Sequence, residues 1–377
     1  MKLALIRQRY TAFGGAERFI DRALAALGEQ KDLSIDLIAR SWEGTPPKGS
    51  VISCDPFYVG RTWRDWSFGR RAKSLVSESC YDLVQSHERI DCCDIFRAGD
   101  GVHAQWLVNR ARSISSFRRW LQGWAPWHLY TLGAERKLFS STKLKAVICN
   151  SNMVAGEIKR YFGVDGRKIH VIYNGIDLEQ FRPQPEAGKA LRESLGMPHN
   201  GVLFLHVGSG FERKGVPVLL EAFAMASARN AKPCRLAIVG SDRHLTAMQA
   251  RARQLGISGK VHFPGSQLDV LKWYAAADCF VLPTTYDPFP NAVMEALACG
   301  LPVITSLQCG AAELLEEGKT GWSRDALDGN AFAQIMSSID REMCLRMGQQ
   351  ARRLAEQFPI SEMAAQMTAL YRKVLAV

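Results

Sequence analysis

Apolar residues along this chain follow two patterns that alternate. Short apolar runs such as KLALI (2–6) and SIDLIA (34–39) are typical of buried strands, whereas VPVLLEAFAMAS (216–227) has the spacing of a helix. Strands that alternate with helices predict a doubly wound parallel sheet. Further strand-like runs in the first half are YDLVQS (81–86), CDIFRAG (93–99), AVICN (146–150) and KIHVIYNGI (168–176).

The pattern starts again after a linker-like stretch at 182–201 that is rich in Pro and Gly. We therefore expect an α/β protein with two Rossmann-like domains, residues 1–173 and 174–360, which face each other across a cleft that holds the active site. An amphipathic helix is expected at 361–377, after the second sheet is complete, and it would pack back on the first domain.

Positive charge is concentrated in the first half. The chain has 48 Lys and Arg against 37 Asp and Glu. Residues 1–173 hold 27 basic and 17 acidic side chains, whereas residues 174–377 hold 21 and 20. This asymmetry predicts an anionic partner for the first domain, such as nucleic acid, a membrane surface or a phosphorylated substrate.

No stretch reaches the roughly 18 uninterrupted apolar residues that a membrane span needs, and the first residues lack the pattern of a secretory signal. We therefore expect a cytoplasmic protein. The ten cysteines show no CxxC spacing, so we expect reduced core residues rather than a metal or redox site.

Residues 106–145 combine aromatic and basic side chains, with eight Lys and Arg and the single acid Glu135. A similar patch occupies 60–73. Basic residues mixed with Trp suit an anionic membrane surface and a phosphorylated glycolipid. The alternatives are a surface that stacks nucleic-acid bases, or an ordinary core with a solvated basic face. The residues expected to contact the membrane or the acceptor are Trp106, Arg118, Arg119, Trp120 and Trp124.

The segment TTYDPFPNAVMEALACGLPVIT (284–305) carries two acids, Asp287 and Glu295. A helix that begins near Pro290 would direct the N–H groups of Asn291 and Ala292 toward the preceding loop, where they suit a phosphate. Glu295, about one turn further on, could accept two hydroxyl hydrogen bonds, as from a ribose, and Asp287 could do the same for a sugar. The alternative is a capping or solvated Asp and an exposed helical Glu.

This segment resembles the paired-acid signature of the family-four retaining glycosyltransferases with the GT-B fold, in which Glu and then Gly-x-Pro-Val follow a first acid. This chain has Asp287 where that family usually has Glu, and Pro290 where it has Gly. Five other segments resemble the family in the same order, namely FGGAER (13–18), YNGID (173–177), VGSGFERKGV (207–216), IVGSD (238–242) and HFPGS (262–266). SWEG (41–44) and DIFRAGDGVHAQWL (94–107) most resemble the bacterial lipopolysaccharide core glucosyltransferases.

The resemblance implies a role for individual residues. Arg213 and Lys214 would bind the diphosphate and stabilise it as it leaves, and together with Asp287 and Asp100 they form the expected catalytic set. Asp100 would lie beside the reacting sugar, its alternative being a helix N-cap, and His103 would lie near the acceptor, its alternative being a packed or solvated histidine. Glycines of three loops would approach the phosphates or flank the base, namely Gly14, Gly15, Gly240 and Gly265.

The resemblance also implies a function. The protein would be a retaining, metal-independent hexosyltransferase that moves a hexose from a UDP-sugar, with UDP-glucose favoured, to a membrane-held glycolipid of the lipopolysaccharide core. It would need no bound cofactor and no nucleic-acid partner, and it would lie against the anionic inner membrane. One alternative is the same chemistry on a capsule, exopolysaccharide or other glycan intermediate. Another is a nucleic-acid- or nucleotide-binding protein without activity, whereas the lack of GxGxxG disfavours an NAD enzyme.

Overall fold

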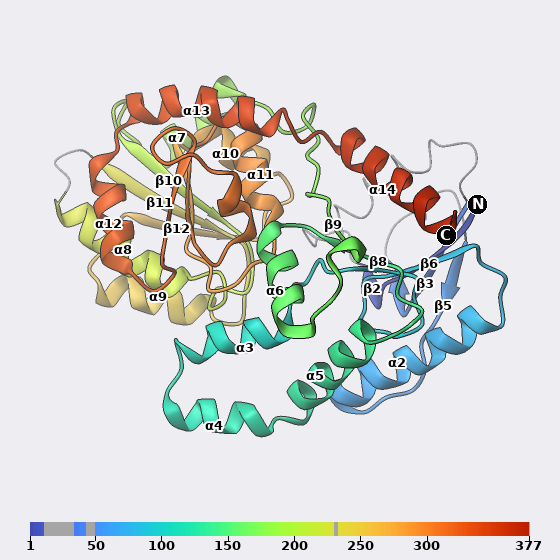
Figure 1. The fold of residues 1–377 in the computed structure, drawn as a ribbon. Coiled ribbons are helices and arrows are strands. Elements are labelled where there is room, and N and C mark those ends of the chain that lie inside the picture. The colour runs from blue at the N-terminus through green and yellow to red at the C-terminus, as the bar shows by residue number, and fades with distance from the viewer. Residues whose placement is uncertain (11–33, 43–49, 230–232, 377) are drawn as a thin grey trace. The chain divides into compact units, whose positions relative to one another are not determined.

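The computed structural model describes residues 1–10, 34–42, 50–229 and 233–376, which form two compact units. The N-terminal unit contains residues 1–175 and 360–377, and the C-terminal unit contains residues 176–359. The chain thus passes between units after Gly175, rather than after residue 173 as the sequence suggested. Both units are parallel sheets with helices, so the predicted α/β architecture is confirmed (Figure 1).

The N-terminal unit is built on a seven-stranded sheet of order β5-β3-β1-β6-β7-β8-β9, whose described strand pairs are parallel. Its strands are β1 (Lys2–Ile6), β3 (Ser34–Ala39), β5 (Val51–Ser53), β6 (Leu83–Ser86), β7 (Ile95–Arg97), β8 (Ala146–Cys149) and β9 (Ile169–Val171), with β2 (Arg9–Tyr10) and β4 (Ser41–Trp42) paired separately. Its helices are α2 (Gly60–Ser77), α3 (His103–Ala111), α4 (Ser116–Trp124), α5 (Pro126–Phe139), α6 (Asn152–Phe162), the 3-10 helix η1 (Gly166–Lys168) and α14 (Ile360–Leu375).

Alternate residues of β1 pack on opposite faces of this sheet, because successive strand side chains point in opposite directions. Leu5 belongs to a core that includes Tyr371 of α14, whereas Ile6 belongs to a second core that includes Phe68 of α2. The C-terminal helix α14 therefore covers one face of the N-terminal sheet (Figure 1). No helix of the described residues is both long and apolar enough to cross a membrane.

The C-terminal unit is built on a six-stranded parallel sheet of order β12-β11-β10-β13-β14-β15. Its strands are β10 (Val202–Val207), β11 (Cys234–Val239), β12 (Val261–Gly265), β13 (Cys279–Leu282), β14 (Val303–Ser306) and β15 (Gly321–Arg324). Its helices are α7 (Pro185–Ser194), α8 (Val216–Arg229), α9 (Leu245–Gln254), α10 (Leu271–Ala276), α11 (Asn291–Ala298), η2 (Gly310–Leu314), α12 (Gly329–Ser338) and α13 (Arg341–Ala355). Strand β15 lies at the edge of this sheet, next to β14, and was not expected from the sequence.

The linker-like stretch at 182–201 is part of the C-terminal unit and contains helix α7. Pro185 occupies the first helical turn, where its missing N–H has no intrahelical role. A Cβ at Gly188 would lie 2.2 Å from the carbonyl oxygen of Ala275, so this glycine lets α7 pack closely on α10. The expectation of a linker was wrong here, because Pro and Gly serve a helix start and a close helix contact.

The order of the strands along the chain reverses between β10 and β13, the two central strands of the C-terminal sheet. At such a point the connecting loops diverge to opposite faces of a parallel sheet and leave a crevice at the carboxyl ends of the strands. Three of the residues predicted from the sequence to form the site follow these two strands, namely Arg213, Lys214 and Asp287.

Candidate functional site

The loops after β10 and β13 are fastened to each other. The carbonyl oxygen of Arg213 accepts hydrogen bonds from the backbone N–H of Thr285 at 2.8 Å and from the hydroxyls of Thr284 and Thr285 at 3.0 and 3.1 Å. Gly215 has φ +75°, and a Cβ there would lie 1.8 Å from the carbonyl oxygen of Pro283. Only glycine permits this approach, so the two loops form one rigid junction.

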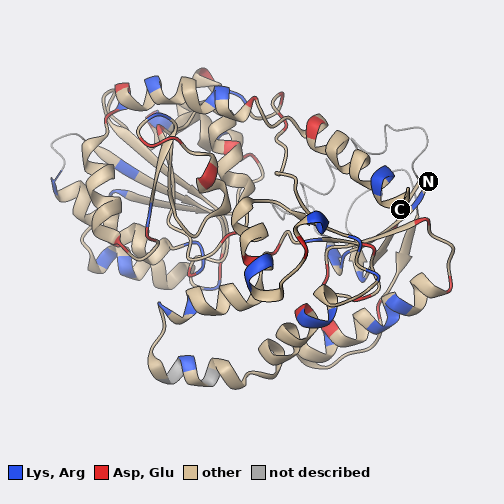
Figure 2. Cartoon of the chain, in the orientation of Figure 1, with Lys and Arg blue, Asp and Glu red and all other residues tan. Residues whose placement is uncertain are grey.

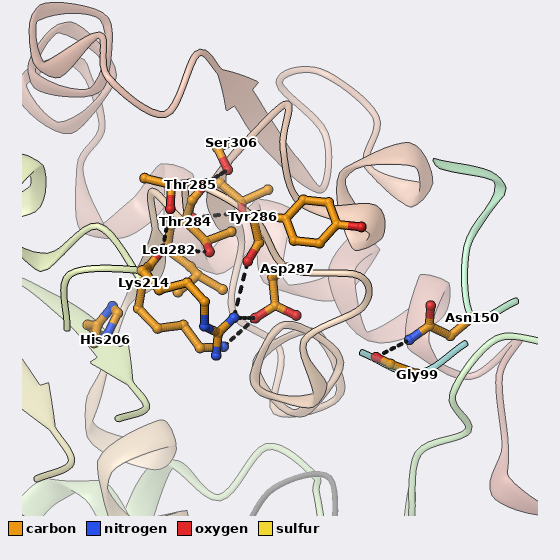
Figure 3. A network of polar contacts seen from close by, with 12 residues as sticks. Gly99, Asn150, His206, Lys214, Leu282, Thr284, Thr285, Tyr286, Asp287 and Ser306 are labelled. Atoms are coloured by element: carbon orange, nitrogen blue, oxygen red, sulfur yellow. Dashed lines mark hydrogen bonds and ion pairs between the residues drawn. The ribbon is translucent and has the colours of Figure 1, made fainter. Parts of the chain in front are cut away.

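Asp287 accepts from both basic side chains of the first loop (Figure 3). Its Oδ2 lies 2.5 Å from Lys214 Nζ and 3.0 Å from Arg213 Nη1. Arg213 Nη1 also donates to the carbonyl oxygen of Tyr286 at 3.1 Å. Burial raises the pKa of Asp287, but the charges of Lys214 and Arg213 outweigh it and hold that pKa below its ordinary value. Two cations and one carboxylate leave one net positive charge, which suits an anionic ligand.

Helix α11 begins at Asn291, with Pro290 as its N-cap residue. Ala292 lies in its first turn, where backbone N–H groups are not used by the helix itself. Glu295 is only 5% exposed, and its Oε2 accepts from the hydroxyl of Tyr274 at 2.9 Å. Asp287 is 7% exposed. The alternative of a solvated Asp and an exposed Glu is therefore wrong, because both carboxylates are buried.

Asp242, which follows β11, was not predicted from the sequence. Its Oδ2 accepts from the N–H of Phe211 at 2.9 Å, and its Oδ1 accepts from the N–H of His244 at 2.7 Å. Burial raises the pKa of Asp242, but these hydrogen bonds contribute to a net lowering. The carboxylate thereby anchors the loop that carries Arg213 and Lys214. The signal in the sequence was an acid two residues after the glycine that follows the strand, in IVGSD (238–242).

Gly240 and Gly265 lie at the ends of neighbouring strands. The N–H of Gly240 donates to the carbonyl oxygen of Gly265 at 2.9 Å, and a Cβ at Gly240 would lie 2.2 Å from the carbonyl oxygen of Gly208. Gly240 therefore brings the loops after β10 and β11 close together. Its contact with a ligand stays a prediction.

In the N-terminal unit, Asp100 is exposed and pairs with Arg7 at 3.5 Å. His103 is buried, and its Nε2 lies 3.1 Å from His128 Nδ1, with the ring stacked on Trp106. Burial lowers the pKa of His103 to about 3, so the ring is neutral at pH 7. This placement favours the packed histidine that the sequence left as an alternative. Gly14 and Gly15 lie outside the described residues.

The basic, Trp-rich segment forms helices α3 to α5. Trp120 and Trp124 of α4 are 61% and 69% exposed, and Arg119 is exposed beside them. The side chain of Arg118 lies outside the described part of the chain. Trp106 is half-buried against His103, so it does not belong to the exposed group. Figure 2 shows further Lys and Arg along α2 and α5.

Two family models match the chain. Residues 13–180 match "Glycosyltransferase Family 4", and residues 189–354 match "Glycosyl transferases group 1". A D-inositol 3-phosphate glycosyltransferase of Catenulispora acidiphila is 32% identical over 51% of this chain and 47% of its own length. The lipopolysaccharide glucosyltransferase WaaG of Escherichia coli K12 is 24% identical over 85% of this chain and 84% of its own.

Solved structures share the fold. A crystal structure of WaaG, a glycosyltransferase involved in lipopolysaccharide biosynthesis, superposes with a TM-score of 0.83 at 21% identity, covering 98% of this chain and 99% of that one. Anabaena HepE in complex with UDP-glucose superposes with a TM-score of 0.75 at 20% identity, covering 99% and 100%. With the two family models, which between them span most of the sequence, these likenesses place the chain in the GT-B glycosyltransferases.

Proposed function

We propose that this glycosyltransferase moves a hexose from a UDP-sugar, with UDP-glucose favoured, to a phosphorylated glycolipid held at the inner membrane, as in the lipopolysaccharide core. The observation that carries the proposal is the cluster of Lys214, Arg213 and Asp287 at the strand reversal of the C-terminal sheet. This cluster carries a net positive charge, and it lies in the loops after β10 and β13. The first turn of α11 also follows β13, and both features suit a diphosphate. HepE, which shares the fold, was solved with UDP-glucose.

In the proposed reaction, the bond between the anomeric carbon and the β-phosphate oxygen breaks while the acceptor oxygen bonds to the same face of that carbon. The sugar becomes oxocarbenium-like, and the diphosphate gains negative charge as it leaves. Lys214 and Arg213 stabilise that charge, so their effect is largest in the transition state. The acceptor's proton passes to the leaving phosphate. The step retains anomeric configuration and uses neither a metal nor a bound cofactor.

The acceptor is assigned to the N-terminal unit on grounds of charge and surface chemistry. Trp120 and Trp124 project from α4 among basic residues, and indole rings with cations suit a membrane of anionic lipids. An inner-core glycolipid carries phosphate, which guanidinium groups bind well. A capsule or exopolysaccharide intermediate on a lipid carrier fits the same surface.

A thermal-shift panel tests the donor. UDP, UDP-glucose, UDP-galactose, UDP-N-acetylglucosamine, GDP-mannose and ADP-heptose are added to the wild type and to Lys214→Ala. A ligand that binds only the folded state raises the melting temperature. We expect UDP and one UDP-sugar to stabilise the wild type, and Lys214→Ala to lose most of the shift with UDP, because free UDP carries the full charge of the departed diphosphate. A shift with GDP- or ADP-sugars alone would overturn the choice of UDP, and no shift at all would overturn the proposed donor site.

A further inference from the structure

His206 is a fully buried polar residue near the carboxyl end of β10, the strand whose following loop carries Arg213 and Lys214. It lies one residue beyond the last paired positions of β10 and β13, which are Leu205 and Phe280. Its Nδ1 lies 3.1 Å from the carbonyl oxygen of Val281. The His206 side chain therefore binds the carbonyl of Val281 at the point where the described pairing of the two central strands ends.

This contact determines the protonation of the ring. A carbonyl oxygen only accepts, so Nδ1 carries the hydrogen and donates it to Val281. Burial lowers the pKa of His206 to about 4, so the ring is neutral at pH 7. Nε2 therefore presents a lone pair, and this buried atom has no hydrogen-bond partner in the described structure. A buried acceptor without a donor is uncommon and calls for an explanation.

Lys214 is the cation that lies beside this acceptor. Gly208 directly follows the end of β10 and lies two positions after His206. A Cβ at Gly208 would lie 3.6 Å from Lys214 Cε and 3.9 Å from its Cδ, so the lysine side chain lies over the carboxyl end of β10. The positive charge of Lys214 acts on the His206 ring, and both side chains are drawn in Figure 3.

We propose that His206 is a positioning residue for Lys214, and that its Nε2 accepts a hydrogen bond from the lysine ammonium when a diphosphate is bound. This inference rests on the proposed function. An ammonium has three N–H donors. Asp287 takes one of them, a phosphate oxygen takes the second, and His206 takes the third. A neutral acceptor orients the ammonium without cancelling its charge, which a second carboxylate would do.

The competing explanation is that His206 only holds the Val281 carbonyl. Two variants separate these roles. His206→Asn keeps an N–H donor at the position of Nδ1 and loses the acceptor at Nε2. His206→Gln places an amide oxygen near the position of Nε2 and gives up the donor near the backbone. The two roles therefore predict opposite orders for these variants.

The dissociation constants of UDP and of uridine are measured by calorimetry for the wild type and both variants, with thermal unfolding as the check on the fold. We expect His206→Asn to weaken UDP by about tenfold, as loss of a charge-assisted hydrogen bond would. Its affinity for uridine should stay that of the wild type, because uridine has no diphosphate. We expect His206→Gln to keep UDP affinity within about threefold of the wild type.

The same substitutions in a Lys214→Ala background provide the second test, because residues that act through one another show non-additive effects. We expect His206→Asn to cause no further loss of UDP affinity there. The inference would be overturned by an equal loss of UDP affinity in both backgrounds, or by a larger loss in His206→Gln than in His206→Asn. In either case, UDP binding by the wild type would still support the proposed function. A wild type that binds no UDP would overturn both.

Discussion

Lys214 Nζ lies 2.5 Å from Asp287 Oδ2, and this contact joins the loop after β10 to the loop after β13. Both side chains are largely buried, at 12% and 9% exposure. The lysine that the proposed reaction needs at the leaving group is therefore held by a carboxylate that is itself inaccessible. The pair couples the stability of the C-terminal unit to the geometry of its site.

Asp287→Asn should destabilise the protein, because it leaves the Lys214 ammonium with a neutral partner in a buried place. We expect a loss of about 1–3 kcal/mol in the free energy of unfolding, measured by urea denaturation. Glu342→Gln, which removes an exposed pair with Arg346, is the matched control and should change stability by less than about 0.5 kcal/mol. Equal effects of the two substitutions would show that the buried pair contributes no more than a surface pair.

The same carboxylate predicts a pH dependence. The pKa of Asp287 is lowered in the folded protein, so its charge stabilises the fold above the unfolded pKa, and this stability is lost as pH falls through the folded pKa. The wild type should therefore lose stability at pH values below about 4. The Asp287→Asn variant should lose less stability over the same pH interval. Parallel stability curves for the two proteins, measured by urea denaturation from neutral to acid pH, would contradict this assignment.

Glu295→Ala should remove discrimination for the ribose hydroxyls. We expect the wild type to bind UDP more tightly than 2′,3′-dideoxy-UDP, and the variant to bind the two equally, when both affinities are measured by calorimetry. Tyr274→Phe is the control, because it removes the hydrogen bond to Glu295 and keeps the carboxylate. If the variant still prefers UDP by the wild-type ratio, Glu295 does not contact the ribose.

Gly215→Ala should disrupt the junction of the two loops. The residue has φ +75°, and its new Cβ would lie 1.8 Å from the backbone oxygen of Pro283. We expect a loss of about 1–3 kcal/mol in the free energy of unfolding, together with weaker UDP binding. Gly259→Ala, where a Cβ meets nothing within 4 Å, is the matched control and should leave both quantities near their wild-type values.

Trp120→Ala with Trp124→Ala should reduce binding to vesicles that contain anionic lipid, because both indole rings are exposed on α4. Cosedimentation with anionic and with neutral vesicles measures the effect. Leu345→Ala, at an exposed apolar position of α13 in the C-terminal unit, serves as the control. Unaltered binding by the double variant would remove α4 from the proposed membrane surface.

Local pattern was enough for the elements around the candidate site. The Pro-rich loop and the small-residue segment that follows it predicted a helix that begins near Pro290, and α11 begins at Asn291. Strand and helix periods are local properties, so they are visible in one sequence. The same argument correctly predicted α14 and most of the parallel strands, but it missed the edge strands β5 and β15.

Composition misled where a residue served a contact that is distant in the sequence. The Gly and Pro of residues 182–201 predicted a linker, yet Gly188 permits the approach of α7 to α10. Asp242 and His206 were not singled out, because their significance lies in partners that the fold brings from other loops and strands. A side chain's partner depends on the order of strands in the sheet, which local periodicity does not specify.

The sequence by itself determined the α/β alternation, the excess of basic residues in the first half and the residue types of the site, since each is a property of neighbouring positions or of composition. Only the tertiary structure decided that Asp287 and Glu295 are buried, that Lys214 bonds to Asp287, and that His103 packs among aromatic rings. Burial and pairing depend on which loops meet at the carboxyl ends of parallel strands, and that meeting exists only once the sheet has formed.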